Sequence, residues 1–347
     1  MPSNLHETLF EAAADAIIDG DLEALDRFLG ENPNLAHARS SRAHGSTLLH
    51  YVSANGVEDF RQKTPANIVA IATRLLDAGA DVNAEAHSYG DGDTTLMLVA
   101  TSVHPQRAGV QLDLMRLLLD RGAVIPPNAV YASLANGRHE AAEFLLDRGA
   151  LLDLSTIDAA DANGMTLLHH AVSAGSLRIV RMLLDRGAAL DVRNRYGGTA
   201  LEQAIWSAKH ARGERRYEDA RHGYLAAVEV CRASGDAGLL AHTLRHLGDI
   251  EREMARMGDA EIHLVEALNI ARREEVAPLE LANTIRVLAL IRGDEALWRE
   301  AHGLYVRANV PAGIAETARR LAALARVESE AEEWMRIAGA ADTAAQS

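Results

Sequence analysis

The chain has 347 residues, with 35 Lys and Arg against 49 Asp and Glu, and its formal net charge is −14. This length suffices for about two domains or one long repeat array, and the acidic balance disfavours nucleic acid as a partner because like charges repel. The single cysteine, Cys231, excludes a disulfide within the chain and a zinc site built from several of its own cysteines.

A six-residue pattern recurs along the first half of the chain. Leu-Leu-Asp-x-Gly-Ala occurs at residues 75–80, 118–123, 145–150 and 183–188. Threonine-leucine signals precede three of these copies, and a related signal follows the last, at Thr47, Thr95, Thr166 and Thr199. A threonine hydroxyl can cap the first turn of a helix, and a glycine can adopt the left-handed conformation that ends one. The pattern therefore predicts short helical hairpins whose apolar faces must stack on neighbouring hairpins.

These residues resemble the ankyrin repeat, most closely at residues 164–194. The resemblance implies an ankyrin solenoid over residues 1–208, with a capping unit at residues 9–35 and about five units in all, followed by the start of a sixth. It also implies that His50 and His169 form structural hydrogen bonds to neighbouring loops. Insertions near residues 58–66 and 104–110 are expected to separate the two helices of the second and third units.

After about Lys209 the helical runs become longer. Apolar residues recur at helical spacing in residues 217–234, 239–257 and 260–275. Small residues at Gly248, Ala260 and Ala267 lie among large ones, and these positions resemble the tetratricopeptide repeat. The resemblance implies closely packed helical hairpins over residues 209–347, closed by helices near residues 312–327 and 328–339. We expect the helix that begins at Thr199 to serve both arrays, without a flexible linker.

The expected fold is therefore all-α, an ankyrin-repeat solenoid continuing into a tetratricopeptide-like helical-hairpin solenoid. Such a fold favours a non-enzymatic scaffold or adaptor that binds a partner protein or peptide through its concave surfaces. The candidate contacts of the first half are residues expected at exposed loop tips and outer helix positions: Tyr51, Asn55, Tyr89, His170 and Tyr196. The candidates of the second half are groove positions implied by the tetratricopeptide resemblance: Lys209, Arg212, His242, Arg245, Asp249, Arg252, Asn283 and Arg286.

Charge indicates a different partner for each half. The arginines expected in the second-half groove suit an acidic peptide, because a guanidinium binds a carboxylate through paired hydrogen bonds. The alternative is a solvated groove in which these arginines pair with carboxylates of the chain itself. The first half, residues 1–208, has 16 basic and 26 acidic residues, which favours a basic surface as its partner.

Two other classes of function stay open. One is a small-molecule or metal-dependent catalyst on a helical scaffold, for which His242 and His246 are a conceivable metal pair because they lie four residues apart on one helix. The other is a self-assembling structural protein with an interface on the C-terminal helix at Trp334, Met335 and Ile337. The residues favour no catalytic group, cofactor or metal, and Cys231 is expected to be buried. No segment predicts a membrane span or a secretion signal, so we expect a cytoplasmic protein without membrane contacts.

Overall fold

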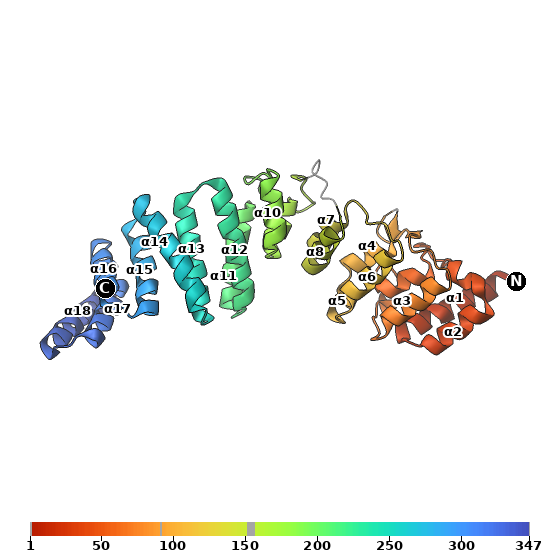
Figure 1. Cartoon of the computed structure of the whole chain (residues 1–347), viewed down its shortest axis with the longest axis horizontal. Helices are drawn as coiled ribbons and strands as arrows, with labels where there is room; N and C mark the ends of the chain where they lie inside the picture. Colours follow the sequence, from red (N-terminus) through yellow and green to blue (C-terminus); the bar gives the residue numbers. More distant parts are fainter. Residues whose placement is uncertain (1, 91, 151–156, 347) are drawn as a thin grey trace. The chain divides into compact units, whose positions relative to one another are not determined.

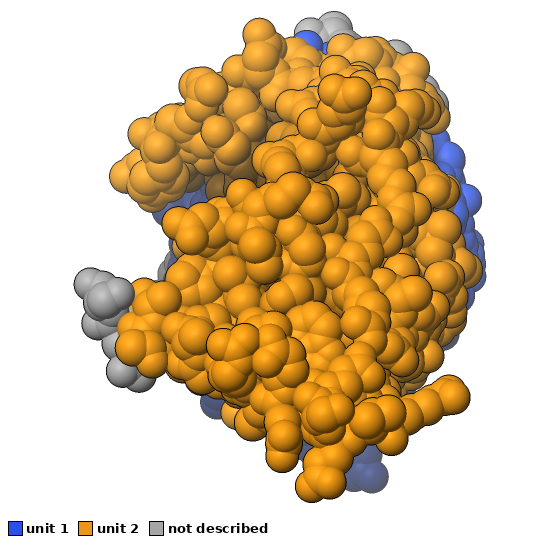
Figure 2. All heavy atoms as spheres, turned by 90° about the vertical axis from the view of Figure 1, so that its left-hand side faces the viewer, with its two compact units in different colours: residues 1–159 blue, residues 160–347 orange. Residues whose placement is uncertain are grey.

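The computed structural model describes residues 2–90, 92–150 and 157–346 of the chain. Its regular structure in these ranges is helical apart from one pair of two-residue strands, which confirms the predicted all-α repeat solenoid. The chain divides into two compact units, residues 1–159 (unit 1) and residues 160–347 (unit 2), coloured blue and orange in Figure 2. No helix of the described part of the chain is both long enough and apolar enough to cross a bilayer.

Unit 1 consists of short helices in successive pairs. In chain order its elements are α1 (Pro2–Asp19), α2 (Leu22–Glu31), the 3-10 helices η1 (Pro33–His37), η2 (Leu48–Ser53) and η3 (Asp59–Arg61), α3 (Ile68–Asp77), β1 (Glu85–Ala86), β2 (Asp93–Thr94), α4 (Thr95–Thr101), α5 (Val103–Arg107), α6 (Gln111–Asp120), α7 (Ala129–Ala135) and α8 (His139–Asp147). The strands pair in antiparallel fashion, with Glu85 opposite Thr94. Both predicted insertions are present between the paired helices, one carrying η3 and the other α5.

Unit 2 begins with two short helices, and its later helices are longer. Its helices are α9 (Leu167–Ser173), α10 (Leu177–Asp185), α11 (Ala200–Gly213), α12 (Tyr217–Ser234), α13 (Ala237–Glu253), α14 (Met257–Arg273), α15 (Pro278–Arg292), α16 (Glu295–Arg307), α17 (Pro311–Leu324) and α18 (Glu328–Gln346). Each helix from α11 onward packs against the next one in the chain (Figure 1). The space-filling view shows that the surface of unit 2 is indented on one side (Figure 2).

Helix α11 is shared by two kinds of hairpin. It packs against the short helix α9 and also against the long helix α12, as predicted for the helix that begins at Thr199. The segment between α11 and α12 holds only the tight turn around Arg215, a residue in the left-handed conformation. Short and long hairpins therefore stack directly within unit 2. It stays a prediction that ankyrin repeats end at residue 208 and that tetratricopeptide-like repeats begin at residue 209.

Threonine caps start the first helices of the repeats. Thr166 and Thr199 each accept a hydrogen bond from the backbone of the first turn, and Thr47 forms a capping box at the start of η2. In the third unit the cap is Thr94, whose hydroxyl accepts a bond from the backbone of Met97, and not Thr95 as the sequence signal suggested. Two adjacent threonines offer the same chemistry, so the signal alone misses the register by one residue.

The two predicted structural histidines hold neighbouring repeats together. The imidazole Nε2 atom of His50 lies 3.2 Å from the carbonyl oxygen of Asp93. The equivalent atom of His169 lies 3.2 Å from the carbonyl oxygen of Gly198. In both residues the Nδ1 atom accepts a hydrogen bond from the backbone of the capping threonine. The structural role that the ankyrin resemblance implied for both histidines is thus confirmed.

Acid is expected to weaken the repeat that contains His50. Burial lowers the pKa of His50 to about 4, below the usual value of about 6.5 in an unfolded chain. The unfolded state therefore binds the extra proton between pH 6.5 and pH 4, and the free energy of unfolding falls as the pH decreases through that window. Thermal melts from pH 7.5 to pH 4 should show this loss, and a His50→Gln variant should show a smaller one. An unchanged pH slope in a folded variant would contradict the assignment.

The long hairpins are packed around small residues. Gly248 of α13 lies against the side chain of Leu264 and the backbone of Ala260, which confirms the close approach predicted there. Helix α15 ends at Gly293, which is in the left-handed conformation, and Asp294 caps α16. The turn of the hairpin formed by α15 and α16 therefore lies at these two residues. The C-terminal α18 packs part of its apolar face, including Trp334, against α15–α17.

Candidate functional site

Two of the five predicted contact residues of the first half are wrong as exposed contacts. Tyr51 is fully buried, with an exposed fraction of 0 %. Its ring packs edge-on against Phe10 at 5.9 Å, because α1 covers the face of η2 that was expected to be open. His170 is also buried, and its Nε2 atom lies 3.1 Å from a carboxylate oxygen of Asp161 in the preceding loop. Tyr51 therefore packs against a neighbouring helix and His170 binds the loop before its own helix, so both are taken up by contacts within the chain.

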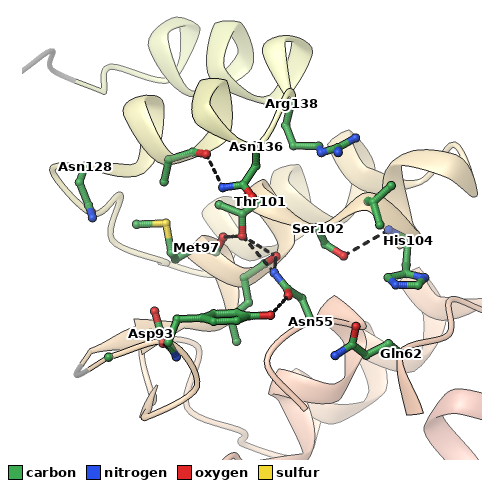
Figure 3. A pocket seen from close by; sticks show the side chains of 15 residues that line it. Asn55, Gln62, Asp93, Met97, Thr101, Ser102, His104, Asn128, Asn136 and Arg138 are labelled. Atoms are coloured by element: carbon green, nitrogen blue, oxygen red, sulfur yellow. Dashed lines mark hydrogen bonds between the residues drawn. The ribbon is translucent and has the colours of Figure 1, made fainter. Parts of the chain in front are cut away.

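Asn55 and Tyr89 lie together at the mouth of a groove in unit 1. The Tyr89 hydroxyl donates to the Asn55 side-chain oxygen at 2.6 Å, and the Asn55 amide donates to the carbonyl oxygen of Leu98 at 3.1 Å. The Tyr89 side chain is 70 % exposed. These bonds hold an aromatic ring in place at the surface, on the edge of a groove of about 650 Å³ (Figure 3).

A loop at residues 194–198 holds Tyr196 at the surface of unit 2. The side-chain oxygen of Asn194 accepts hydrogen bonds from the backbone amides of Tyr196 and Gly198, at 3.0 and 3.1 Å. Arg195 donates to the backbone and side-chain oxygens of Asn163 in the preceding loop, at 2.8 Å each. The Tyr196 ring is 80 % exposed, with the Arg195 guanidinium 5.1 Å from its centre. The loop is thus fixed by hydrogen bonds while its aromatic side chain stays free.

Trp206 on α11 faces the same opening as Tyr196. Thr199 and Glu202 form a reciprocal capping box that fixes the start of α11. Two turns later the Trp206 side chain is 62 % exposed and stacks on the ring of His210, with centres 5.3 Å apart. Tyr196 and Trp206 line one groove of about 780 Å³, called the aromatic groove below. Its other lining residues are Met165, Asn194, Gly197, Gly198, Glu202 and Gln203.

The predicted arginines of the second-half groove are all paired within the chain. Each binds a carboxylate, namely Arg212 with Asp249 at 2.7 Å and Glu253 at 2.6 Å, Arg245 with Glu280 at 2.5 Å, Arg252 with Asp249 at 2.9 Å, and Arg286 with Glu316 at 3.1 Å. These bonds join α11 to α13, α13 to α15 and α15 to α17. The groove therefore matches the alternative of internal ion pairs.

The other predicted groove residues differ in how they are held. Asn283 accepts a hydrogen bond from the Tyr305 hydroxyl at 2.7 Å, and His242 lies 3.1 Å from a Glu280 oxygen. Burial by itself raises the pKa of Glu280, but hydrogen bonds from His242 and Arg245 outweigh it and lower the pKa to about 2. Lys209 is exposed. The carboxylates thus stay ionised and keep the arginines occupied at neutral pH.

The surroundings of His246 and Cys231 do not support the catalytic alternative. The ring of His246 is bound by the guanidinium of Arg245 at 2.9 Å, and its pKa falls to about 3 because of burial and that positive charge. Among the described residues, no group of three or more His, Cys, Asp or Glu is placed to hold a metal ion. Cys231 is buried beside Thr243, and burial raises the pKa of its thiol, so this thiol is a poor nucleophile.

Comparison with known proteins identifies part of the chain. A family model described as ankyrin repeats, in three copies, matches residues 129–213. Ankyrin repeats are confirmed at these residues. The match includes the loop that carries Tyr196 and the helix α11 that carries Trp206. No curated protein matches the chain.

Two solved structures are similar over part of their length. One is the crystal structure of the ankyrin repeat domain of Bcl-3, a member of the IkappaB protein family, at 22 % identity and a TM-score of 0.38, covering 64 % of this chain and 85 % of that one. The other is a chain from the structure of the predatory endopeptidase Bd0816 of Bdellovibrio bacteriovorus in complex with immunity protein Bd3460. It has 22 % identity and a TM-score of 0.37, covering 61 % of this chain and 96 % of that one.

Proposed function

We propose that this protein is a non-enzymatic scaffold that binds a partner protein, with the aromatic groove of Tyr196 and Trp206 as its main contact surface. The observation that carries the proposal is the exposure of these two side chains on a loop and a helix that are themselves fixed by hydrogen bonds. Tyrosine and tryptophan supply much of the binding energy of protein interfaces. A fixed surface also loses little conformational entropy when it binds.

The chemistry of the aromatic groove supports a protein partner over a small substrate. Exposed aromatic rings next to Met165 offer apolar contact, and Asn194 and Gln203 at the same groove offer amide groups for a peptide backbone. An apolar patch with a polar edge is the usual composition of a protein interface. An acidic peptide in the second-half groove is not part of the proposal, because the arginines there already bind Asp249, Glu280 and Glu316.

Removal of the two aromatic side chains is expected to abolish partner binding. Truncation of an interface hot spot costs about 2 kcal/mol or more, which corresponds to about a 30-fold weaker affinity. Proteins captured from a lysate of the source cells by the wild-type chain should be lost with Tyr196→Ala/Trp206→Ala. Titration calorimetry with the recovered partner then measures the loss of affinity.

The matched control is Ile262→Ala. Ile262 is a similarly exposed apolar side chain, 66 % exposed, on α14 away from the aromatic groove, so this variant should keep every partner. Equal capture by the aromatic variant and the wild-type chain would contradict the proposal. Loss of capture with Ile262→Ala would also contradict it, because that result indicates a different surface.

A further inference from the structure

The groove in unit 1 is lined by a guanidinium that forms no ion pair with a carboxylate of the described residues. Arg138 lies in the turn between α7 and α8 and lines the groove of about 650 Å³ that also holds Asn55 and Tyr89. Its Nε atom is buried and has no hydrogen-bond partner, and no carboxylate of the described residues pairs with its guanidinium. Burial and the positive charge of Arg107 lower the pKa of Arg138. The part of the groove that Arg138 lines therefore has an excess of positive charge.

Other partly buried arginines of the chain do not share this situation. Arg61, Arg212 and Arg245 each bind at least one carboxylate of the chain at 2.5 to 2.7 Å. A guanidinium that loses water without gaining an anion costs free energy. A bound carboxylate would restore that loss, because two parallel hydrogen bonds from Arg to a carboxylate are among the strongest in proteins.

The rest of the groove suits an extended peptide. Figure 3 shows Arg138 at one side of the groove and Asp93, the one acidic residue among the described lining residues, on a different element. The lining between them is polar and mostly uncharged, with amide side chains at Gln62, Asn128 and Asn136. Gln62 and Asn136 use their amide nitrogens to bond carbonyl oxygens of the chain, which leaves their side-chain oxygens to accept from peptide N–H groups. Tyr89 adds an aromatic wall at the mouth.

We propose that this groove, named the Arg138 groove, binds an acidic peptide segment of a partner protein, with a carboxylate of that segment on the Arg138 guanidinium. The inference rests on the proposed scaffold function and specifies the chemistry of a partner. It differs from the expectation of a basic partner for this half of the chain. Net charge acts over long distances, whereas the charge inside a groove decides which group binds there.

The test uses a displayed library of random peptides, selected on the full-length chain. Selected peptides are expected to carry a required Asp, Glu or C-terminal carboxylate. Arg138→Gln should weaken their binding at least tenfold, and Arg138→Lys should weaken it less, because it keeps the charge but loses the second hydrogen bond. Arg116→Gln is the control, since Arg116 is half exposed and already pairs with Asp113. It should leave binding unchanged.

Synthetic peptides separate the possible sources of the anion. Replacement of the acidic side chain by its amide, or of the C-terminal carboxylate by a carboxamide, should cost at least tenfold in whichever peptide depends on that group. The same replacement in the peptide should not weaken its binding to the Arg138→Gln variant any further. Glutarate should compete with the peptide, whereas inorganic phosphate at equal ionic strength should not. Stronger competition by phosphate would overturn the carboxylate assignment.

Three further results would overturn the inference: no peptide that prefers the wild-type chain, no acidic preference among the selected peptides, or equal binding to Arg138→Gln. Misfolding does not confuse the test, because the loss of an unpaired charge is expected to keep or raise the melting temperature. The outcome is also separable from that of the scaffold proposal. Capture that is lost with Tyr196→Ala/Trp206→Ala, together with peptides that still bind Arg138→Gln, would reject only the Arg138 groove. The opposite pattern would reject only the aromatic groove.

Discussion

Arg61→Met is expected to destabilise unit 1 by about 3 kcal/mol, at the low end of the cost of breaking a buried ion pair. The Arg61 side chain is buried, and its guanidinium donates to Glu11 at 2.6 Å and to Asp15 at 2.7 Å, both on α1. It also lies 3.6 Å from Glu58. In the variant Glu11 and Glu58 lose this buried cation and keep the more exposed Arg42, which binds Glu11 at 2.8 Å and Glu58 at 2.5 Å. The expected loss of stability lies at the low end of that range because Asp15 is half exposed and stays hydrated when Arg61 is removed.

Amide hydrogen exchange can locate this loss. Peptides from α1 and from η3 should exchange faster in Arg61→Met than in the wild-type chain, because the insertion that carries Arg61 is held to α1 by these bonds. Arg74→Met is the matched control. Its ion pair with Asp26 is partly exposed, so its loss should cost at most about 1 kcal/mol. Equal exchange in the two variants would contradict a special role for Arg61.

Gly248→Leu is expected to disrupt the hairpin of α13 and α14. A Cβ atom at this position would lie 2.5 Å from Leu264 Cγ and 3.1 Å from the carbonyl oxygen of Ala260, so the two helices would have to move apart. Overpacking of this kind costs about 1–3 kcal/mol for small additions, and the larger leucine should exceed that range. Even Gly248→Ala should lower stability, although alanine favours a helix by about 1 kcal/mol over glycine.

Melting temperatures measured by circular dichroism test this prediction. A loss of about 2 kcal/mol lowers the melting temperature of a domain of this size by about 4–8 °C. Gly258→Ala is the control, because Gly258 lies in α14 and a Cβ there would meet no atom within 4 Å. It should keep or raise the melting temperature. A stable Gly248→Leu protein with an unchanged melt would show that the hairpin is packed more loosely than described.

The sequence by itself determined the local elements of this protein. The Thr47, Thr166 and Thr199 caps and the Nδ1 contacts of His50 and His169 each depend on residues within one helical turn. The contacts of these histidines with the next repeat, and of Gly248 with the next helix, recur with the repeat pattern. Short-range chemistry of this kind repeats with the chain, so a recurring pattern exposes it. The hairpins, their order and the helix shared by short and long hairpins could therefore be predicted.

The tertiary structure decided which side chains face outward and which charges are free. Tyr51 is buried because α1, far away in the sequence, lies across η2. The groove arginines are satisfied because carboxylates on later helices reach them, as Glu280 reaches Arg245. Arg138 differs for the opposite reason: its Nε atom has no hydrogen-bond partner, and no carboxylate among the described residues reaches it. Exposure and pairing depend on groups brought together from distant positions, and no single segment of the sequence records what will pack against it.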